Sequence, residues 1–369
     1  MRELLFYFLR LGTFGFGGPI ALAGHMQRDL VEERRWVTRQ DYTEGLALSQ
    51  LSPGPLAAQL AMYLGWVRAG IGGAAAVAAA FIAPSFVMVL LISWLYLRFG
   101  GMPWIQSAFY GVGAAVIAVI ARSAYKLGRS TVGRDPLLIA LLAISGLFTA
   151  WTEKEVIWIF LGCGVAALLI KSRRPAAAMF VPFWLVSGLH GPAMGELWRI
   201  AWYFTEAGAF VFGSGLAIVP FLHGGVVDQF HWLTERQFLD AVAVAMITPG
   251  PVVITVAFIG FLVAGLAGAS ISAAGVFLPP FLFVIVLAPH FRRWSRSAHV
   301  RAFVAGVTAA AAGAIAGAAY VLGKRAVIDL PTALICLVTL ALLIKARKIP
   351  EPILIVAAGI AGLILQRAV

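Results

Sequence analysis

The sequence predicts an all-α polytopic membrane protein made of two homologous halves, and three observations support this fold class. Hydrophobic residues make up 61% of the chain and charged residues 12%, with a mean hydropathy of +0.93, whereas soluble domains carry roughly 25% charged residues. The apolar runs are long, and lipid accepts helices but no open sheets, because every backbone group must be paired there. The helix-breaking tripeptide Pro-Gly-Pro occurs twice, at 53–55 and 249–251, inside stretches that are otherwise helical in character.

Each half is expected to hold six helical segments, because its apolar runs reach or approach the ~20 residues that cross a bilayer. In the first half these are residues 3–24, 41–66, 70–98, 103–122, 136–151 and 155–170. In the second half they are residues 197–222, 237–261, 265–289, 301–322, 328–344 and 352–368. The first run carries Arg10 and no small-residue cleavage site follows it, so it is expected to be a retained span.

An internal repeat relates the two halves. An offset of 196 residues aligns 11–22 with 207–218 and the first Pro-Gly-Pro with the second, and after a slip of one residue Gly65 aligns with Gly260 and Gly70 with Gly265. Shared Trp, Pro and Gly at fixed spacing indicate a tandem duplication. The expected domains are an N-terminal repeat over 1–174, a membrane-crossing linker over 175–195 and a C-terminal repeat over 196–369.

The distribution of Lys and Arg bears on the orientation of the halves. If residues 176–190 cross the membrane, seventeen of these cations lie on the side of the N-terminus and ten on the other, with Arg10 inside a span. Without that crossing the division is 13 against 14. Because cytoplasmic loops concentrate Lys and Arg, the sequence favours thirteen crossings, a cytoplasmic N-terminus and halves of opposite orientation. This number changes if the Pro-Gly-Pro segments re-enter the membrane without crossing it.

The first Pro-Gly-Pro is expected to end one helix and begin another. Pro53 and Pro55 cannot continue the helix that approaches them, since a proline nitrogen donates no hydrogen bond and its ring clashes with the preceding turn. Prolines suit the first turn of a helix, so a half-helix is expected over 55–66 with Ser52 as its N-cap.

The second half repeats this break. Ser52, Pro53, Gly54 and Pro55 are equivalent to Thr248, Pro249, Gly250 and Pro251. Interrupted helices at the same place in two inverted repeats are a recurring design of secondary transporters, whose substrate lies near the midplane. Two half-helix N-termini would hold an anion there without a buried Lys or Arg, and the alternative is a proline kink made for packing. Gln59 and Thr255, one turn into each half-helix, are candidates to contact the substrate.

A second paired break lies in the first helix of each half, at FGFGGP (14–19) and FVFGSG (210–215). Its glycines either allow two helices to pack closely or expose backbone to a ligand, and glycine alone does not discriminate between these roles. The candidate substrate-binding residues of this break are Phe16, Gly17, Gly18, Pro19, Gly213, Ser214 and Gly215.

Ionisable residues near the breaks are candidates for ion coupling, since charges within a membrane are rare and usually functional. Arg10 and Glu206 are equivalent in the repeat and would form an ion pair across a pseudo-twofold axis. Glu44 and Asp240 are also equivalent. The simpler interpretation of this second pair is an acidic first turn of a helix that starts at the membrane interface.

Other function classes lack their signatures. The two cysteines, Cys163 and Cys336, lie in apolar segments, and no metal motif, nucleotide-binding loop or cofactor motif occurs. No cofactor, no enzymatic activity and no nucleic-acid partner are therefore expected, and the net charge of +12 is explained by cytoplasmic loops. The expected partners are the lipid bilayer and a small anion. Glycines such as Gly306 and Gly313 would pack either within the monomer or between subunits of a homo-oligomer.

The pattern FGFGGP…W…SPGP, with its echo FGSG…W…TPGP, resembles the chromate ion transporter family (ChrA-like proteins) in its long, two-domain form. The resemblance covers nearly the whole chain. It implies a bacterial inner-membrane protein that exports chromate and confers chromate resistance, with two homologous domains of opposite orientation. The second half departs from the pattern where Ser214 and Gly215 replace Gly18 and Pro19, so the two halves are expected to contribute unequally.

The favoured function is therefore energy-coupled export of chromate. Sulfate is a tetrahedral dianion of nearly the same shape, so a transporter or exchanger of sulfate or another oxyanion is the alternative. A passive anion channel is less favoured, because no ring of charged residues marks a continuous polar path.

Overall fold

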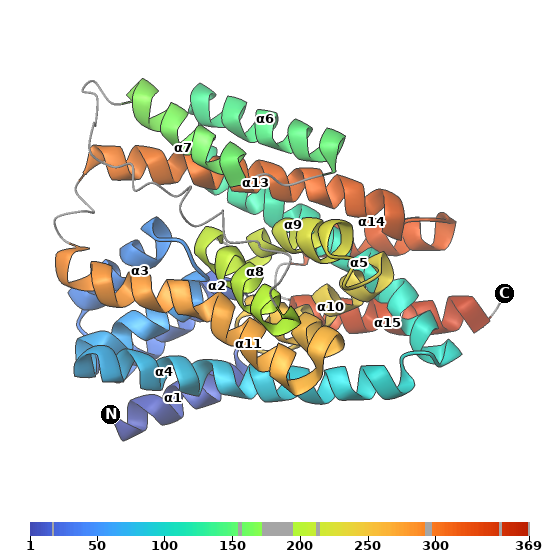
Figure 1. The fold of residues 1–369 in the computed structure, drawn as a ribbon, viewed down its shortest axis with the longest axis horizontal. Coiled ribbons are helices and arrows are strands. Elements are labelled where there is room, and N and C mark those ends of the chain that lie inside the picture. Colours follow the sequence, from blue (N-terminus) through green and yellow to red (C-terminus); the bar gives the residue numbers. More distant parts are fainter. Residues whose placement is uncertain are drawn as a thin grey trace.

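The computed structural model describes residues 1–16, 18–153, 157–171, 195–211, 215–291, 297–346 and 349–367, and all elements in this part of the chain are helical. The first half contains α1 (Arg2–Phe14), α2 (Gly18–Met26), the π-helix η1 (Gln27–Glu33), α3 (Arg39–Leu51), α4 (Leu56–Phe99), α5 (Pro103–Val132), α6 (Pro136–Thr152) and α7 (Ile157–Lys171). The second half contains α8 (Glu196–Phe210), η3 (Gly215–Ala217), α9 (Ile218–His223), the π-helix η4 (Gly224–Gln229), α10 (Glu235–Ile247), η5 (Val252–Ile254), α11 (Thr255–Leu287), η6 (Ala288–His290), α13 (Ala298–Ala326), α14 (Leu330–Lys345) and α15 (Glu351–Arg367). The predicted all-helical class is confirmed, and Figure 1 shows the long helices lying roughly along one common direction.

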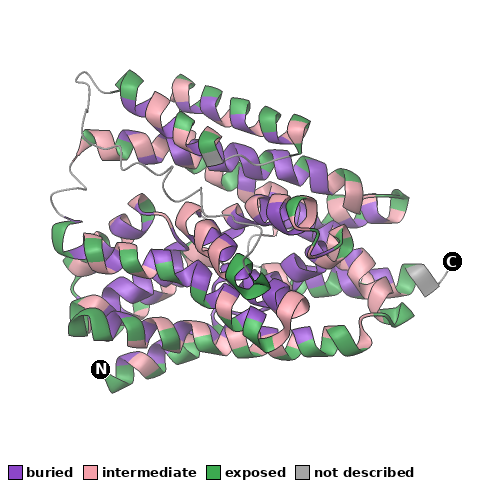
Figure 2. Ribbon diagram, in the orientation of Figure 1, coloured by how far each residue is buried: buried purple, intermediate pink, exposed green. Residues whose placement is uncertain are grey.

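Four stretches of the described helices are long and apolar enough to cross a membrane: Leu56–Phe99, Pro103–Val132, Val252–His290 and Ala298–Ala326. Four shorter apolar helices, α6, α7, α14 and α15, accompany them. Buried residues gather on the faces that the helices turn toward one another (Figure 2). Large apolar side chains such as Leu147 and Trp151 are exposed on the outer faces, as expected of helices that face lipid. The chain is a multi-pass membrane protein.

The expected first span over 3–24 is wrong, because the chain folds back on itself after Phe14. The guanidinium of Arg34 lies 5.8 Å from the centre of the Tyr7 ring, so η1 runs back alongside α1. Gly18 has φ +74°, which favours glycine at the start of α2. The second half does the same, since the Tyr203 hydroxyl on α8 donates to the carbonyl of Phe221 on α9 at 2.7 Å.

The expected single segment over 41–66 is also a helical hairpin. α3 ends at Leu51 and α4 begins at Leu56. Gly45 packs directly on the ring of Tyr63, although each lies nine residues from Gly54, which is possible only if the two helices run antiparallel. The first limb of α4, residues 56–68, is about 20 Å long at 1.5 Å per residue and too short for a bilayer core of about 30 Å.

Ser52 does not cap the second helix of this hairpin. It is the C-cap of α3, and its hydroxyl donates to the carbonyl of Leu48 at 2.8 Å, while Pro55 is the N-cap of α4. Thr248 has the same position at the end of α10. The expected N-cap was wrong because a Ser after a helix can bond back to the turn that it ends.

A sharp turn follows the first limb of α4. Ala69 and Gly70 have non-helical dihedral angles, with φ +60° at Gly70, and the backbones of Gly65 and Gly73 touch on either side of the turn. α11 turns in the same way at Ala264–Gly265. The residues that close the turns recur in both halves because both positions need a positive φ that only glycine adopts without strain.

The two hairpins of the first half begin and end on one face of the molecule. Met1, Val37 and Arg68 line the same small pocket, which places the start of α1, the start of α3 and the end of the first α4 limb together. We call this side the N-terminal face. The C-terminal end of α15 lies at the opposite end of the molecule (Figure 1).

The two halves pack through reciprocal contacts between hairpin turns. The N–H of Gly54 donates to the carbonyl of Val211 at 2.5 Å, and the N–H of its equivalent, Gly250, donates to the carbonyl of Gly15 at 3.0 Å. Such reciprocity is the pattern that a twofold rotation produces. Four hairpin turns therefore meet in the interior, two from each half.

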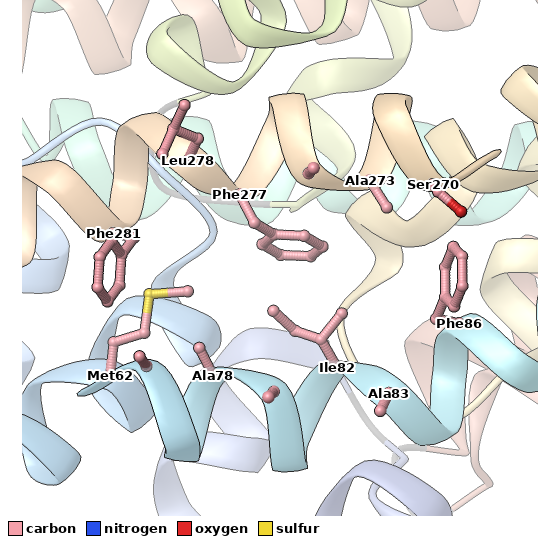
Figure 3. A pocket seen from close by; sticks show the side chains of 13 residues that line it. Met62, Ala78, Ile82, Ala83, Phe86, Ser270, Ala273, Phe277, Leu278 and Phe281 are labelled. Carbon is pink, nitrogen blue, oxygen red and sulfur yellow. The ribbon is translucent and has the colours of Figure 1, made fainter. Parts of the chain in front are cut away.

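The long helices α4 and α11 lie side by side and run in opposite directions. Along the apolar groove between them, residue numbers rise from Met62 to Phe86 on α4 while they fall from Phe281 to Ser270 on α11 (Figure 3). The groove has a volume of about 470 Å³. Its lining is apolar apart from Ser270, so it offers an oxyanion no charged partner.

The glycines of α13 pack within the monomer. A Cβ atom on Gly313 would collide with the carbonyl of Leu142 on α6, and one on Gly306 with the carbonyl of Cys163 on α7. This face is therefore occupied by helices of the same chain.

Candidate functional site

A cationic pocket of about 110 Å³ lies where three of the hairpin turns approach α5. It is lined by Gly18, Pro19, Ile20, Arg122, Ser123, Lys126, Leu127, Ser130, Leu216, Val252 and Glu351. Gly18 and Pro19 open α2, Leu216 follows the second-half glycine break, and Val252 follows the second Pro-Gly-Pro. The pocket therefore joins motif residues of both halves to two basic side chains.

Helix α5 supplies the polar wall of this pocket. Arg122, Lys126 and Ser130 are spaced by one helical turn, which places them on one face. The expected end of this helix at residue 122 is wrong, since α5 continues to Val132. The basic residues of α5 lie along one face of the helix. The helix therefore continues beyond its apolar run, because an exposed helix end does not need apolar residues.

The opposite wall contains the N-terminus of α2 and a carboxylate. The first N–H groups of a helix have no partner within it and carry its positive dipole end. Glu351, the first residue of α15, forms an ion pair with Arg122 at 3.5 Å. The two charges neutralise one another, so Lys126 leaves the pocket with a net positive charge.

The basic residues of this pocket are not repeated at the equivalent positions of the other half. Under the 195-residue offset, Arg122 corresponds to Gly317 and Lys126 to Val321. Gly317 packs against the carbonyl of Gly146 on α6, so a helix contact fills that space. At these two positions the second half therefore has no basic side chain, although the fold around them is repeated.

The structure places few of the other predicted residues in this pocket. Gly17, Gly213 and Ser214 lie outside the described residues, Phe16 is exposed, and Gly215 is buried in η3 beside the side chain of Val253. The hydroxyl of Thr255 donates to the carbonyl of Val252 at 2.8 Å. The remaining predicted residues, Ser52, Pro53, Gly54, Pro55, Gln59, Thr248, Pro249, Gly250 and Pro251, form the turns behind the pocket without lining it.

Gln59 holds the first Pro-Gly-Pro turn together. Its amide nitrogen donates to the hydroxyl of Ser52 at 3.0 Å and to the carbonyl of Pro53 at 2.6 Å. The side chain is fully buried. These contacts give Gln59 a role in the shape of the turn.

The predicted ion pair of Arg10 with Glu206 is not found among the ion pairs of the described residues. Arg10 lines a surface groove of about 900 Å³ between α1 and η1, together with His25, Arg28 and Arg34. Glu206 lies half-buried on α8. Each first helix folds back as a hairpin within its own half, so Arg10 and Glu206 lie on separate hairpins and do not pair across the axis.

The equivalent acids Glu44 and Asp240 have different environments. Glu44 is half-exposed and accepts a hydrogen bond from Gln40 at 3.0 Å. Asp240 is only 4% exposed and accepts a hydrogen bond from the hydroxyl of Tyr96 at 2.7 Å. Each is the sixth residue of its helix, α3 (Arg39–Leu51) or α10 (Glu235–Ile247), so the interpretation of both as first-turn acids is wrong.

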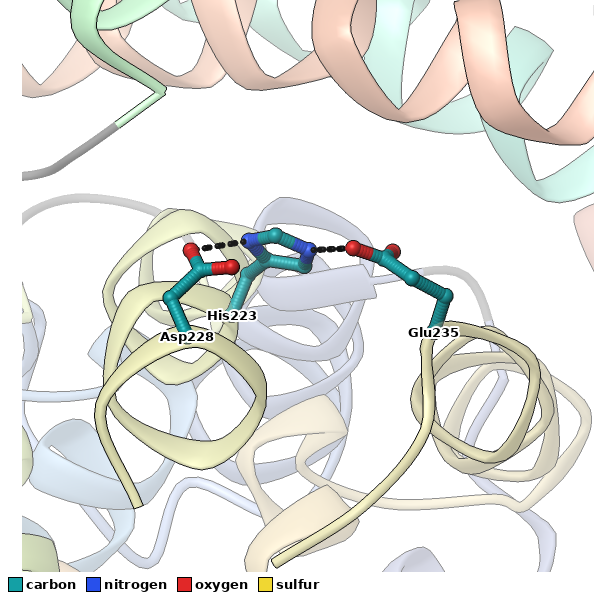
Figure 4. A group of neighbouring side chains, drawn as sticks. All are labelled: His223, Asp228 and Glu235. Atoms are coloured by element: carbon teal, nitrogen blue, oxygen red, sulfur yellow. Dashed lines mark hydrogen bonds and ion pairs between the residues drawn. The ribbon is translucent and has the colours of Figure 1, made fainter. Parts of the chain in front are cut away.

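His223, Asp228 and Glu235 form the cluster of metal-ligand type found among the described residues (Figure 4). The ring nitrogens of His223 lie 3.3 Å from Asp228 and 2.9 Å from Glu235. The guanidinium of Arg325 contacts Glu235 and also Glu153. Because Arg325 already supplies the cation, the cluster is an ion-pair network that ties α9, α10 and α13 together.

Burial lowers the pKa of His223 below its ordinary value of 6.5. The positive charge of Arg325 acts in the same direction, while Asp228 and Glu153 oppose it. Burial dominates, so the imidazole is neutral in the folded protein at pH 7.

Arg122 and Lys126 are candidate site residues that sequence reasoning missed. Arg122 is the last residue of the expected segment 103–122 and Lys126 lies beyond it, because the apolar run ends at Ala121. Their spacing of one turn, continued by Arg129 and Ser130, is the signal of a helix that continues beyond its apolar part.

Comparisons with known proteins agree with the resemblance in the sequence. A family model described as chromate transporter matches residues 2–168 and again residues 198–363. A chromate transport protein of Cupriavidus metallidurans is 55% identical over 99% of this chain and 93% of its own length. A probable chromate transport protein of Synechococcus elongatus is 52% identical over 99% of this chain and 95% of its own length, and one of Pseudomonas aeruginosa is 29% identical over 98% and 91%. No solved structure matches the chain.

Proposed function

This chain belongs to the chromate transporter family, and on that premise we propose that it is a secondary transporter that exports chromate across the bacterial inner membrane and confers chromate resistance. The pocket of Arg122 and Lys126 binds the oxyanion. The observation that carries this assignment is the meeting of a helix N-terminus and two basic side chains with motif residues of both halves.

The chemistry of the pocket suits a tetrahedral dianion. Lys126 supplies a full positive charge and Arg122 a planar guanidinium that bonds two oxygens at once. Ser123 and Ser130 provide hydroxyl donors, and the N-terminus of α2 provides backbone N–H groups. An anion that binds here competes with Glu351 for the guanidinium of Arg122.

We also propose that two repeats, 1–174 and 196–369, have opposite orientations in the membrane, joined by a crossing at 175–195. Apart from residue 195, this linker lies outside the described residues. The antiparallel course of α4 and α11 and the reciprocal contacts of the hairpin turns support this arrangement. The hairpins enter the membrane from one face and return to it, and each half then crosses four times. With the linker this makes nine crossings, in place of the thirteen that the sequence favours, because each hairpin returns to the face from which it entered.

The positive-inside rule is consistent with this topology. Twenty Lys and Arg residues fall on the N-terminal face and seven on the other, with Arg10 inside a hairpin. Since cytoplasmic loops carry the excess of these residues, the N-terminal face is cytoplasmic. Glu351 lines the oxyanion pocket and begins α15 on this face, so the pocket lies between the hairpin turns and the cytoplasm. This position suits a site that binds a cytoplasmic anion for export.

Alternating access follows from this architecture. The four hairpin turns form the interface of the halves, and a rocking of one half against the other opens the pocket to alternate sides of the membrane. The hydrogen bonds that Gly54 and Gly250 make between the turns join backbone groups, so they can be exchanged with little rearrangement of side chains.

Chromate uptake into inside-out vesicles tests the proposal. Lys126→Met and Arg122→Gln are expected to weaken uptake at least tenfold, because each removes one charge from the pocket. Arg129→Met is the matched control, since Arg129 lies one turn beyond on the same helix and is exposed, with its guanidinium bonded to Tyr125 at 2.9 Å. Full uptake in the two pocket variants would place the binding site elsewhere.

Competition in the same assay reports selectivity. Excess sulfate that suppresses chromate uptake indicates an oxyanion site without discrimination between the two. If the vesicles take up sulfate but no chromate, the proposed architecture stands and the substrate of the protein is a different oxyanion. Flux without any energy source that follows the chromate gradient alone would indicate a channel.

A further inference from the structure

Asp240 is a buried carboxylate on the side of the molecule opposite to the oxyanion pocket. It lies on α10 and is only 4% exposed. The guanidinium of Arg236, one turn earlier, donates to the carbonyl of Gln106 at 3.0 Å, which places this end of α10 beside the start of α5. The start of α5 is on the face away from the N-terminus, because α4 crosses the molecule between its turn at Gly70 and its end at Phe99.

One hydrogen bond joins Asp240 to the other half of the protein. The hydroxyl of Tyr96 on α4 donates to its carboxylate at 2.7 Å. The Tyr96 ring is held between aromatic neighbours, with Phe258 of α11 at 5.2 Å and Phe109 of α5 at 5.7 Å between ring centres. The donor is therefore fixed in place by residues of both halves.

In the part of the chain that the structure describes, no cation forms an ion pair with this carboxylate. Among the described residues, Asp240 forms no ion pair, and the charged or titratable groups that act on it from the helices around it are Tyr96 and Arg236. Arg236 directs its guanidinium to the carbonyl of Gln106 instead. Burial disfavours the charged form of an unpaired carboxylate, and binding a proton removes that charge.

The repeated position in the first half lacks the same chemistry. Tyr96 corresponds to Phe291 under the 195-residue offset, and phenylalanine has no hydroxyl to offer Glu44. Glu44 is half-exposed beside Gln40. The contact of Tyr96 with Asp240 therefore has no counterpart between Phe291 and Glu44, and it lies on the face opposite to the oxyanion pocket.

We infer that Asp240 binds the proton that drives transport, an inference that rests on the proposed function. A proton from the outer side adds to the carboxylate of Asp240 and makes it neutral. The bond from Tyr96 then changes from a hydrogen bond to an anion into a weaker one between neutral groups, which loosens the contact between α4 of one half and α10 of the other.

The released contact lets the halves move, and the proton leaves Asp240 on the cytoplasmic side as the carboxylate is re-formed. One proton therefore enters for each cycle in which the oxyanion leaves. No other group changes its covalent state. Tyr96 is a positioning residue, which acts by favouring the ionised form of Asp240.

Proteoliposomes holding the full chain separate this coupling from transport itself. Exchange of labelled for unlabelled chromate, with no gradient, measures binding and movement. Accumulation driven by a pH gradient measures coupling. For Asp240→Asn we expect exchange within about threefold of the wild type and loss of pH-driven accumulation by more than tenfold, because a permanently neutral side chain cannot carry a proton.

Further variants distinguish a loss of coupling from a loss of folding. Asp240→Glu is expected to restore part of the pH-driven accumulation, and Tyr96→Phe to shift the pH at which uptake is half-maximal while exchange persists. Glu44→Gln is the matched control in the other half and is expected to keep pH-driven accumulation. A wild type without chromate exchange would refute the proposed function.

Two outcomes overturn the inference alone. One is pH-driven accumulation that survives in Asp240→Asn. The other is equal loss of exchange and accumulation in that variant without rescue by Asp240→Glu, because Asp240 would then serve the structure or the movement and not the coupling.

Discussion

Gly250 donates its backbone N–H to the carbonyl of Gly15 at 3.0 Å, a bond that joins the second Pro-Gly-Pro turn to the first glycine break. The hydroxyl of Ser85 on α4 reinforces this contact with a bond to the carbonyl of Pro249 at 2.7 Å. These bonds connect positions more than 160 residues apart in the chain. They show why the turns contain glycine and proline, which bring backbone close to backbone with no side chain between them.

Gly250→Ala is expected to damage both stability and transport. Gly250 has φ +99°, and a Cβ atom there would collide with the hydroxyl of Ser85. The backbone strain alone costs about 1–3 kcal/mol. Thermal unfolding of the purified protein and chromate uptake measure the two effects. Gly133→Ala is the control, because Gly133 also has a positive φ of +52° but no neighbouring atom within 4 Å, and it should keep full uptake.

Glu351→Gln is expected to raise the affinity for chromate. The carboxylate of Glu351 lies 3.5 Å from Arg122, so its removal frees the guanidinium for the substrate and removes a like charge from the pocket. A gain of about 1 kcal/mol, or roughly fivefold in the half-saturating concentration, is reasonable for one partly exposed charge. Uptake at graded chromate concentrations measures it. Asp135→Asn, which breaks the ion pair with Lys171, should leave affinity unchanged, and weaker binding in Glu351→Gln would contradict the assigned pocket.

Acidification is expected to destabilise the protein through His223. Burial holds its pKa below the ordinary 6.5, so the unfolded chain takes up this proton first as the pH falls. The contribution of His223 to stability is therefore full above pH 6.5 and is lost as the pH drops toward the folded-state value. His223→Gln should show a smaller decrease of the thermal midpoint between about pH 7.5 and about pH 5.5 than the wild type. His231→Gln is the control, since His231 is exposed. Its thermal midpoint should decrease by as much as that of the wild type over the same pH range.

Cysteine labelling is expected to report opposite faces for the two ends of α5. A cysteine in place of Gly101, before α5, should react with a membrane-impermeant thiol reagent applied to intact cells, because that loop faces outward in the nine-crossing topology. A cysteine in place of Gly133, after α5, should react only after permeabilisation. No neighbouring atom lies within 4 Å of an added Cβ at either glycine, and the positive φ of Gly133 adds only local backbone strain. The reverse pattern would invert the proposed orientation.

Much of the architecture is predictable because its signals are local. Composition indicates membrane helices, and the positions where proline and glycine stop a helix are properties of a few consecutive residues. The ends of α3 and α10 at Leu51 and Ile247 follow from the prolines just beyond them. The family was recognisable from the same short motifs, and the comparisons confirm it.

The course of the chain after each break was not predictable in this way. A break between two helices permits a kinked span or a hairpin, and both satisfy the same local rules. The packing of Gly45 on Tyr63 and of Tyr7 under Arg34 decides for hairpins. These contacts depend on shape across the turn, which no periodicity along the chain records.

The sequence by itself determined the class of the protein, its family, the repeated motifs and the places where helices must end, because each of these depends on composition or on neighbouring residues. Only the tertiary structure decided that Arg122 and Lys126 meet the glycine breaks of both halves, and that Tyr96 bonds to Asp240 over 144 positions. The physical reason is that a binding site is a contact between elements brought together by packing, and electrostatic partners are chosen by distance in space.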